Sequence, residues 1–134
     1  MVDRNDLTTP QPRPSINFGG VNMDCADAQA MAEFYGRLLG WQVTYRDDDF
    51  ISMQDPGGGA GLSFQEETWY QPPVWPERPG QQTKMIHLDI KVGDLNAAVA
   101  FALAAGARLA EHQRRSDLRV LLDPAGHPFC LCLD

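Results

Sequence analysis

The stretch DAQAMAEFYGRLLGW (residues 27–41) decides the fold, because DLNAAVAFALAAGA (residues 94–107) repeats its pattern. The aspartates that open the two stretches lie 67 positions apart, as do Phe34 and Phe101. Two Asp-Pro turns farther along the chain also recur, 68 positions apart. Matches in the same order and at a nearly constant offset indicate an internal duplication of one structural unit.

Each repeated stretch carries the signals of a helix. Asp27 and Asp94 stand at the expected N-cap, where a carboxylate accepts hydrogen bonds from the free N–H groups of the first turn. Apolar side chains then recur at helical spacing in both stretches. Gly40 and Gly106 follow, and glycine readily adopts the left-handed conformation that ends a helix. The sequence therefore predicts two helices at equivalent places in the two copies.

Short strands separated by turn residues surround each expected helix. In the first copy the expected strands are residues 16–24, 41–46, 49–54 and 60–66. In the second copy they are residues 85–92, 107–113, 117–122 and 128–133. Asp-Pro turns at Asp55 and Asp123 separate the last two strands of each copy. Each copy therefore reads βαβββ, and the expected fold class is α+β.

The domain organisation follows from the proline content of two segments. Residues 1–14 contain three prolines and no apolar run, which predicts a disordered N-terminal arm and not a secretory signal. Residues 15–134 are expected to form one domain, with module one at residues 15–67 and module two at residues 84–134.

The linker between the modules, residues 68–83, holds four prolines, which exclude a helix or a central strand. It also carries Trp69, Tyr70 and Trp75. We interpret these aromatic residues as packing between the sheets. The alternative is a lid that stacks on a planar ligand.

The overall composition excludes several classes of protein. At 134 residues, with 43% hydrophobic and 22% charged side chains, the chain has the composition of one globular domain. Its formal net charge of −7 argues against nucleic-acid binding, which needs a basic face. No stretch approaches the roughly 20 apolar residues of a membrane span. The three cysteines lack a disulfide-rich spacing, so we expect free thiols in the cytoplasm.

With both copies in place, residues 15–134 resemble the vicinal oxygen chelate superfamily of glyoxalases and bleomycin-resistance proteins, most closely its glyoxalase-like domains. The likeness is carried by DCADAQAMAEFYGRLLGW (24–41), KMIHLDIKVGDLNAAVAF (84–101) and DPAGHPFCLCL (123–133). The resemblance implies two βαβββ modules that form a curved, mixed half-barrel sheet with the helices on its convex side. It also implies a hollow that holds a small molecule, often beside a divalent metal, and a homodimer.

The resemblance further implies where a metal would bind: one ligand from the first strand of each copy and one carboxylate from the last. In the second copy these positions fall on His87 and Cys130. In the first copy they fall on Gly20 and on Ser63 or Gln65, so the set lacks its carboxylates and one histidine. Hard divalent cations need such ligands. We therefore expect no metal cofactor, and if a divalent metal does bind, His87 and Cys130 are its candidate ligands.

Strand alternation places the candidate ligand-binding residues. In the strand at 85–92 one face is apolar, and the other face carries Met85, His87, Asp89 and Lys91. The repeat sets Phe18, Gly20, Asn22 and Asp24 opposite them. We expect both sets to line the hollow, together with Phe64 and Cys130. His87 is interpreted as a ligand-binding residue in preference to a structural histidine, and Asp89 as a group that orients it or raises its pKa.

For four residues, structural explanations compete with functional ones. Gly20 either permits strong sheet coiling or leaves space for a ligand. Cys130 and Cys132 share one strand face, and we interpret them as small buried apolar residues in preference to a metal-binding or redox pair. His127 precedes a proline and is expected to tip a turn.

Two functions compete on these observations. The first is a metal-independent module that binds a small, partly apolar drug or metabolite in the concave face, to sequester or sense it. The second is a lyase, isomerase or dioxygenase with His87 as base or metal ligand. We find no Ser–His–Asp order and no phosphate-binding loop that would offer a third route. Because the concave face has few ionisable groups, we favour the binding module, with a small molecule and a second copy as its partners.

Overall fold

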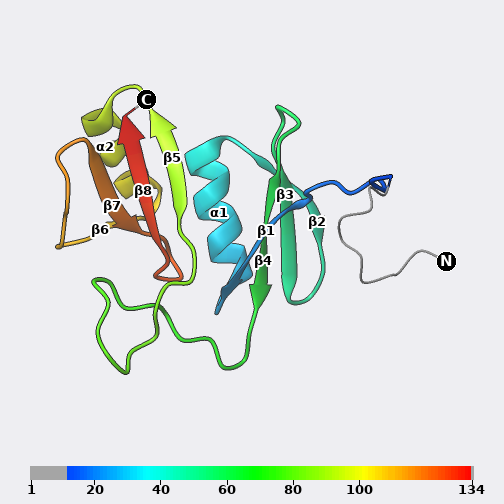
Figure 1. Cartoon of the computed structure of the whole chain (residues 1–134), viewed down its shortest axis with the longest axis horizontal. Coiled ribbons are helices and arrows are strands. Elements are labelled where there is room, and N and C mark those ends of the chain that lie inside the picture. The colour runs from blue at the N-terminus through cyan, green and yellow to red at the C-terminus, as the bar shows by residue number, and fades with distance from the viewer. Residues whose placement is uncertain (1–11, 134) are drawn as a thin grey trace.

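The computed structural model describes residues 12–133, which form an α+β fold of two βαβββ modules (Figure 1). The first module contains β1 (Gly20–Cys25), α1 (Ala28–Leu39), β2 (Gln42–Arg46), β3 (Phe50–Gln54) and β4 (Gly61–Glu66). The second contains β5 (Leu88–Val92), α2 (Leu95–Ala105), β6 (Arg108–Leu109), β7 (Leu118–Leu122) and β8 (Pro128–Leu133). The expected fold class is confirmed. Most of the N-terminal arm predicted at residues 1–14 lies outside the described residues.

The helix boundaries are those that the sequence predicts. The Asp27 carboxylate accepts a hydrogen bond from the Ala30 N–H at 3.0 Å, and Asp94 accepts one from Ala97 at the same distance. Gly40 ends α1 with a φ of +71°, which a residue with a Cβ rarely adopts. The two aspartates therefore cap the N-termini of their helices with the same hydrogen bond in both modules.

Each module folds its four strands into a mixed sheet of its own, in the order β1-β4-β3-β2 and β5-β8-β7-β6. The first strand of each module runs parallel to the last one, and the other pairings are antiparallel. The register is equivalent in the two sheets, because Asn22 pairs with Ser63 and Asp89 pairs with Cys130. This pairing identifies Ser63, and not Gln65, as the counterpart of Cys130.

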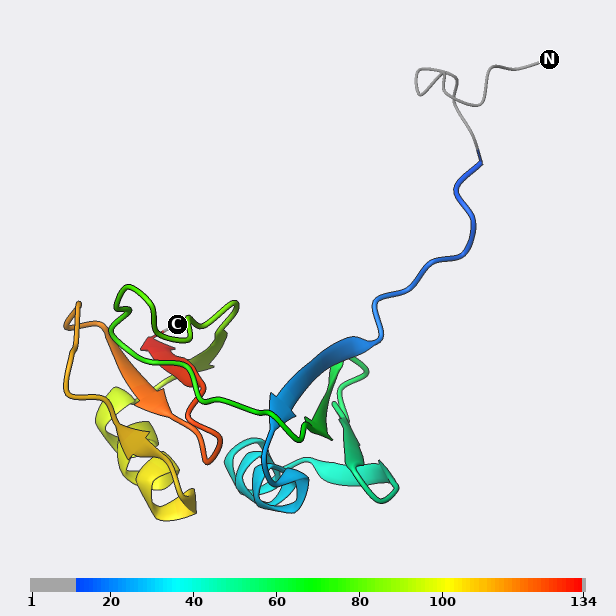
Figure 2. The ribbon, with the colours of Figure 1, turned by 90° about the horizontal axis from the view of Figure 1, so that it is seen from below.

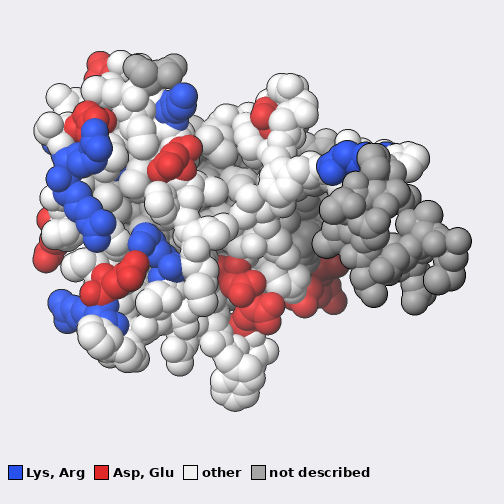
Figure 3. Space-filling view, viewed as in Figure 1, with Lys and Arg blue, Asp and Glu red and all other residues white. Residues whose placement is uncertain are grey.

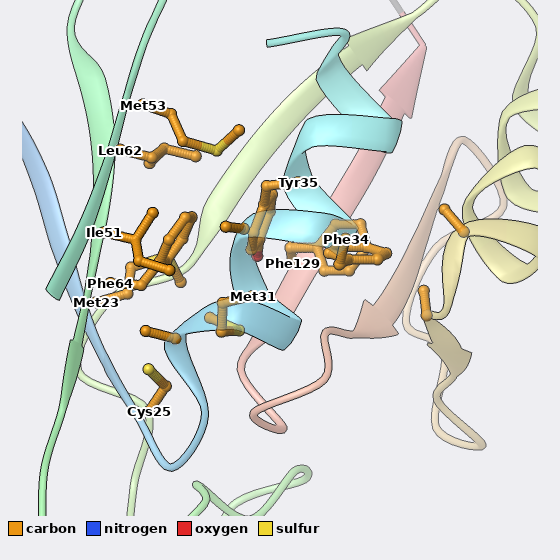
Figure 4. Packing of buried hydrophobic residues seen from close by; sticks show 14 of the residues in the cluster. Met23, Cys25, Met31, Phe34, Tyr35, Ile51, Met53, Leu62, Phe64 and Phe129 are labelled. Carbon is orange, nitrogen blue, oxygen red and sulfur yellow. The ribbon is translucent and has the colours of Figure 1, made fainter. Parts of the chain in front are cut away.

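Helix α1 lies between the two sheets in the view of Figure 1 and supplies five of the buried residues of the core, among them its two central aromatic rings (Figures 1 and 4). Tyr35 stacks on Phe64 of the first sheet, with ring centroids 5.6 Å apart. Phe34 contacts Phe129 of the second sheet, with ring centroids 5.8 Å apart. All four rings are almost completely buried in one cluster that spans both modules. The two sheets are therefore held together through the large side chains of one helix.

Three strands are markedly shorter than the sequence predicts: β1 begins at Gly20 instead of residue 16, and β5 and β6 are shortened for identifiable reasons. Strand β5 begins at Leu88 instead of residue 85. Its parallel neighbour β8 begins at Pro128, and because proline has no N–H to donate, the pairing does not extend farther. Strand β6 stops at Leu109, and the side-chain amide of Gln113 then takes the place of a strand. It donates to the Val120 carbonyl and accepts from the Val120 N–H, both at 2.9 Å.

Seen from below, both helices lie on one side of the sheets, and the linker crosses the opposite side of the second sheet (Figure 2). There the Trp75 ring packs against the buried side chains of Val120 and Cys130. The linker thus covers part of the concave face of the second module.

Within residues 12–133, neither helix is long and apolar enough to cross a membrane.

Candidate functional site

The concave faces of the two sheets carry different chemistry at equivalent positions. In the first sheet the row that starts at Asn22 continues through Ser63 to Ser52, so it is neutral and polar. In the second sheet the matching row is Asp89, Cys130 and Val120. The second hollow is therefore both more ionisable and more apolar than the first.

His87 and Asp89 contact each other on the second face. The His87 Nε2 lies 3.2 Å from an Asp89 carboxylate oxygen, with the two side chains 40% and 65% exposed. Cys130 pairs with Asp89 across β5 and β8, so that ligand atoms of all three residues lie within 4.8 Å of one another. The sequence anticipated the pairing of His87 with Asp89, although the structure alone establishes their contact.

Cys130 behaves as a buried apolar residue in this cluster. Burial first, and the neighbouring Asp89 carboxylate second, raise the pKa of its thiol to about 11. Burial likewise raises the pKa of Cys132. Both cysteines, like Cys25, are free. At neutral pH the Cys130 thiol therefore stays protonated, which makes it a poor nucleophile.

Phe64 does not line the hollow, and this prediction is wrong. Its side chain is completely buried against Tyr35 on the helix side of the first sheet, because strand alternation turns Ser63 and Gln65 to the other face. Phe18 and Met85 are on the surface, 74% and 84% exposed, and each precedes the strand in which it was expected.

A cavity of about 560 Å³ opens where β1 of the first module meets the linker and the segment before β5. Asn22 and Met85 line it, as the sequence predicted for a ligand site. Asp24, which the sequence sets on the same face, lines it too. Trp69 and Tyr70 also belong to its wall, in line with the alternative of a lid and not with the preferred interpretation as packing, whereas His127 was not predicted as a ligand-binding residue.

His127 fixes the junction of the modules beside this cavity. Its Nε2 lies 2.6 Å from the backbone carbonyl oxygen of Asp24, which can only accept, so this nitrogen carries the proton. The Tyr70 hydroxyl donates to the Ala125 carbonyl at 2.6 Å and lies 3.3 Å from the same nitrogen. Burial, followed by the Asp123 carboxylate, raises the pKa of Tyr70. His127 therefore joins the turn before β8 to β1 as well as tipping that turn.

A second cavity, of about 180 Å³, lies over the concave face of the second sheet and has His87 and Cys130 in its wall. Only some of the predicted ligand-binding residues line a cavity, and these divide between the two; Phe18, Gly20, Phe64 and Asp89 line neither. Asn22 and Met85 line the larger one, and His87 and Cys130 line the smaller one.

The comparisons with known proteins agree with this geometry. A family profile described as "Glyoxalase-like domain" matches residues 20–132. The chain belongs to the glyoxalase-like domain family. No match is found among curated proteins. The resemblance to the glyoxalase-like domains of the vicinal oxygen chelate superfamily is therefore confirmed.

Solved structures share the fold of this glyoxalase-like domain at low sequence identity. A glyoxalase/bleomycin resistance protein/dioxygenase family enzyme from Burkholderia phytofirmans is 21% identical, with a TM-score of 0.65, covering 86% of this chain and 96% of the other. A glyoxalase-related enzyme from Fulvimarina pelagi is 18% identical, with a TM-score of 0.64, covering 89% of each chain. The fosfomycin resistance protein FosX from Mesorhizobium loti is 12% identical, with a TM-score of 0.61, covering 88% and 92%.

The four positions at which the resemblance places metal ligands do not form a complete set in this glyoxalase-like domain. The first module offers Gly20, which has no side chain, and the hydroxyl of Ser63. The second module offers His87 and the protonated thiol of Cys130. Asp89 adds a carboxylate, but from the same module. The residues present therefore do not fit a metal bound symmetrically between the two modules.

The structure also explains Gly20. A Cβ at this position would lie 2.6 Å from the backbone carbonyl oxygen of Gly61, its partner in β4, far inside van der Waals contact. The space beside Gly20 is thus filled by the neighbouring strand. This close approach accounts for the glycine, and the alternative that it leaves room for a ligand receives no support.

Proposed function

We propose that this glyoxalase-like protein binds a small, partly apolar molecule in the cavity at the junction of its modules, without a metal, to sequester or sense it. The observation that carries the proposal is the cavity of about 560 Å³, which falls within the roughly 300–1,000 Å³ of ligand pockets.

The wall of the junction cavity suits a molecule with an apolar body and a few polar atoms. Trp69, Met85 and Ile86 offer apolar surface, and all three are largely exposed. Asn22 and Thr83 offer neutral hydrogen-bonding groups beside them. Exposed apolar side chains gathered around a cavity are typical of a binding site.

The related structures support a role in binding or resistance. One solved structure of this fold is described as a fosfomycin resistance protein, and another as a glyoxalase/bleomycin resistance protein/dioxygenase family enzyme. We infer from this likeness that the junction cavity takes a drug or metabolite. Because one fold hosts many activities, the identity of the molecule must come from the site itself.

Native mass spectrometry of the full chain, with elemental analysis of the same sample, tests the proposal directly. We expect a small organic molecule retained without stoichiometric metal. Titration of the recovered molecule should show that Trp69→Ala weakens binding by about tenfold or more, equivalent to about 1.4 kcal/mol. Phe101→Ala is the matched control, because it removes an exposed ring on α2, outside the cavity. Equal binding by both variants would move the site elsewhere.

The contact of His87 with Asp89, beside Cys130, favours one alternative function. In this alternative the protein is a lyase, isomerase or dioxygenase in which His87 removes a proton and Asp89 orients the imidazole. Turnover of a superfamily substrate that His87→Gln abolishes and that Trp69→Ala leaves intact would establish the enzyme and reject the binding module as the main function.

We also propose a homodimer in a reducing compartment such as the cytoplasm. Exposed apolar residues of the linker and the following segment, Trp69, Met85 and Ile86, support the association, and three free thiols support the compartment. Light scattering of the full chain should give about twice the monomer mass of 14.9 kDa. A mass near that of the monomer at high protein concentration would reject the dimer.

A further inference from the structure

The smaller cavity, of about 180 Å³, has a more basic wall than the junction cavity, which is lined by Asp24 and Glu67 as well as by Lys84. Its apolar part is formed by Leu118, Val120 and Cys130 on the concave face of the second sheet. The remainder, apart from Pro128, is basic or aromatic. It lies over one sheet only, whereas the junction cavity uses both modules, and Lys84 is the residue that lines both.

Four basic side chains and no acidic one line this cavity among the residues that the structure describes: Lys84, His87, Arg114 and Arg115. This is unusual in a chain with a net charge of −7. Figure 3 shows a band of Lys and Arg atoms on the side of the second module. A cavity lined in this way attracts an anion and disfavours a cation.

The cations differ in how far they are already neutralised. Lys84 pairs with Glu77 at 2.8 Å, and Arg115 forms two hydrogen bonds to Asp117 at 2.8 and 2.7 Å. His87 lies 3.2 Å from an Asp89 carboxylate oxygen. Arg114 has no carboxylate within ion-pair distance in the described part of the chain. Its guanidinium lies over the Trp75 ring and within electrostatic reach of Glu77, but it keeps its hydrogen-bond donors for a ligand.

Trp75 adds a hydrogen-bond donor to the same wall. The Lys84 ammonium and the Arg114 guanidinium lie 4.5 and 4.7 Å from the centre of its rings. Its Nε1–H is buried and has no hydrogen-bond acceptor among the described residues. A buried donor without an acceptor destabilises a protein, so an acceptor supplied by a ligand is favoured here.

We propose that this cavity is a binding site for a small monocarboxylate with a short apolar tail. The carboxylate accepts hydrogen bonds from the Arg114 fork and from the Trp75 Nε1–H, and the tail lies on Val120 and Leu118. The volume equals that of about six water molecules at roughly 30 Å³ each, which fits an acid of about four carbons.

This site is separate from the junction cavity, so the two proposals fail independently. The test uses the full chain labelled with ¹⁵N, sodium butyrate as the probe, and sodium chloride to hold the ionic strength constant. The indole N–H signal of Trp75 is assigned by its disappearance in Trp75→Phe. We expect this signal to shift saturably with butyrate, while those of the other two tryptophans shift little.

Arg114→Gln should weaken butyrate binding by about tenfold or more, because it removes the charged donor fork. Arg108→Gln makes the same change in charge on an exposed residue of β6 outside the cavity, and should leave the affinity unchanged. If Arg114→Gln loses the dispersed spectrum of a folded protein, Arg114→Lys replaces it, since Lys keeps the charge without the fork and should still bind more weakly.

Three results would overturn the proposal. One is the absence of a saturable shift of the Trp75 signal, and another is equal affinity in the wild type and the Arg114 variant. The third is binding of sulfate or butylammonium as tight as that of butyrate, because sulfate lacks the tail and butylammonium has the wrong charge. Weaker binding of acetate than of butyrate would support the apolar tail contact.

Discussion

The Asp-Pro turn of the first module and that of the second module have the same local chemistry and different surroundings. The Asp55 carboxylate accepts a hydrogen bond from Gly57 N–H at 2.7 Å, and the Asp123 carboxylate accepts one from Ala125 N–H at 2.9 Å. Asp123, however, is only 1% exposed and also accepts a hydrogen bond from the Tyr35 hydroxyl at 2.7 Å. One turn is a surface feature, and the other is part of the contact between modules.

This difference arises on the helices and not in the turns. Adding the 67-residue offset to Tyr35 gives Ala102, so α2 has no hydroxyl with which to reach Asp55. Only α1 carries large side chains into the space between the two sheets, and α2 buries just Ala102 and Ala105. A repeated motif thus preserves local structure, while a single large residue in one copy decides which turn becomes buried.

The largest effect should come from removing that residue. We expect Tyr35→Ala to lower the free energy of unfolding by about 3–5 kcal/mol, because it empties a buried aromatic site and leaves Asp123 without its donor. Urea unfolding curves measure the change. Tyr45→Ala is the control: its ring is exposed, so its loss should cost no more than about 0.5 kcal/mol.

The two turns can be compared by the same substitution in each. Asp123→Ala should cost about 3 kcal/mol, since the Tyr35 hydroxyl and two backbone N–H groups lose their acceptor at about 1 kcal/mol each. Asp55→Ala should cost about 1 kcal/mol for one exposed hydrogen bond. Equal denaturant midpoints for the two variants would show that Asp123 contributes nothing beyond its turn.

A third pair of substitutions tests the phase of the second sheet. Leu88→Ala should cost about 2 kcal/mol, the low end for such a change, because Leu88 packs against the core and is only partly buried. His87→Ala, one residue earlier on the concave side, should stay within about 0.5 kcal/mol. Chemical unfolding of both variants decides the matter, and an exchange of the two results would mean that the strand is out of register.

The buried turn should also give stability a dependence on pH. Burial is the main cause that raises the pKa of Asp123 in the folded protein, so the folded state holds this proton more tightly than the unfolded state. The stability gained from binding this proton is complete below the ordinary carboxyl pKa of about 3.9. It is lost as the pH rises through the higher pKa of Asp123 in the folded protein. Relative to Asp123→Asn, the wild type should therefore lose stability across this window. A parallel pH dependence in both proteins would contradict the prediction.

The smallest effect should come from removing metal. We expect the melting temperature to be unchanged by EDTA, because Gly20 and Ser63 offer neither a carboxylate nor an imidazole. Elemental analysis of protein purified without a nickel column should find well under one metal per chain. About one metal per chain, lost in His87→Ala, would instead mean that His87, Asp89 and Cys130 hold a metal within one module.

The sequence predicts the features of the fold that depend on local chemistry. Asp27, Gly40 and their counterparts fix the helix ends through bonds to residues three or four positions away, so their signal is short in range. The succession of strands along the chain follows from alternation and turns in the same way, whereas their order within each sheet does not. The start of β5 was misplaced because it depends on Pro128, a residue on the neighbouring strand 40 positions away.

The candidate site could be predicted only in part, because its walls come from pairings that the sequence does not display. Phe64 was assigned to the wrong face since the phase of β4 is set by its pairing with β1 and not by its own composition. Trp69 and Tyr70 reach the junction cavity through the path of a linker without regular structure. The contact between His87 and Asp89 was within reach because both lie on one short segment.

The side chain of Gln113 has a consequence for the behaviour of the protein at high concentration. Beyond the two residues of β6, the Val120 carbonyl on the outer edge of β7 still accepts a hydrogen bond from the Ala110 N–H at 3.1 Å, but the Val120 N–H would be left as a template for a strand from another molecule. The side-chain carbonyl of Gln113 accepts from this N–H, and its amide N–H donates to the same Val120 carbonyl. One side chain thus protects the edge of β7 from pairing with another molecule. A longer β6 would have protected it too, but would itself have exposed a new edge.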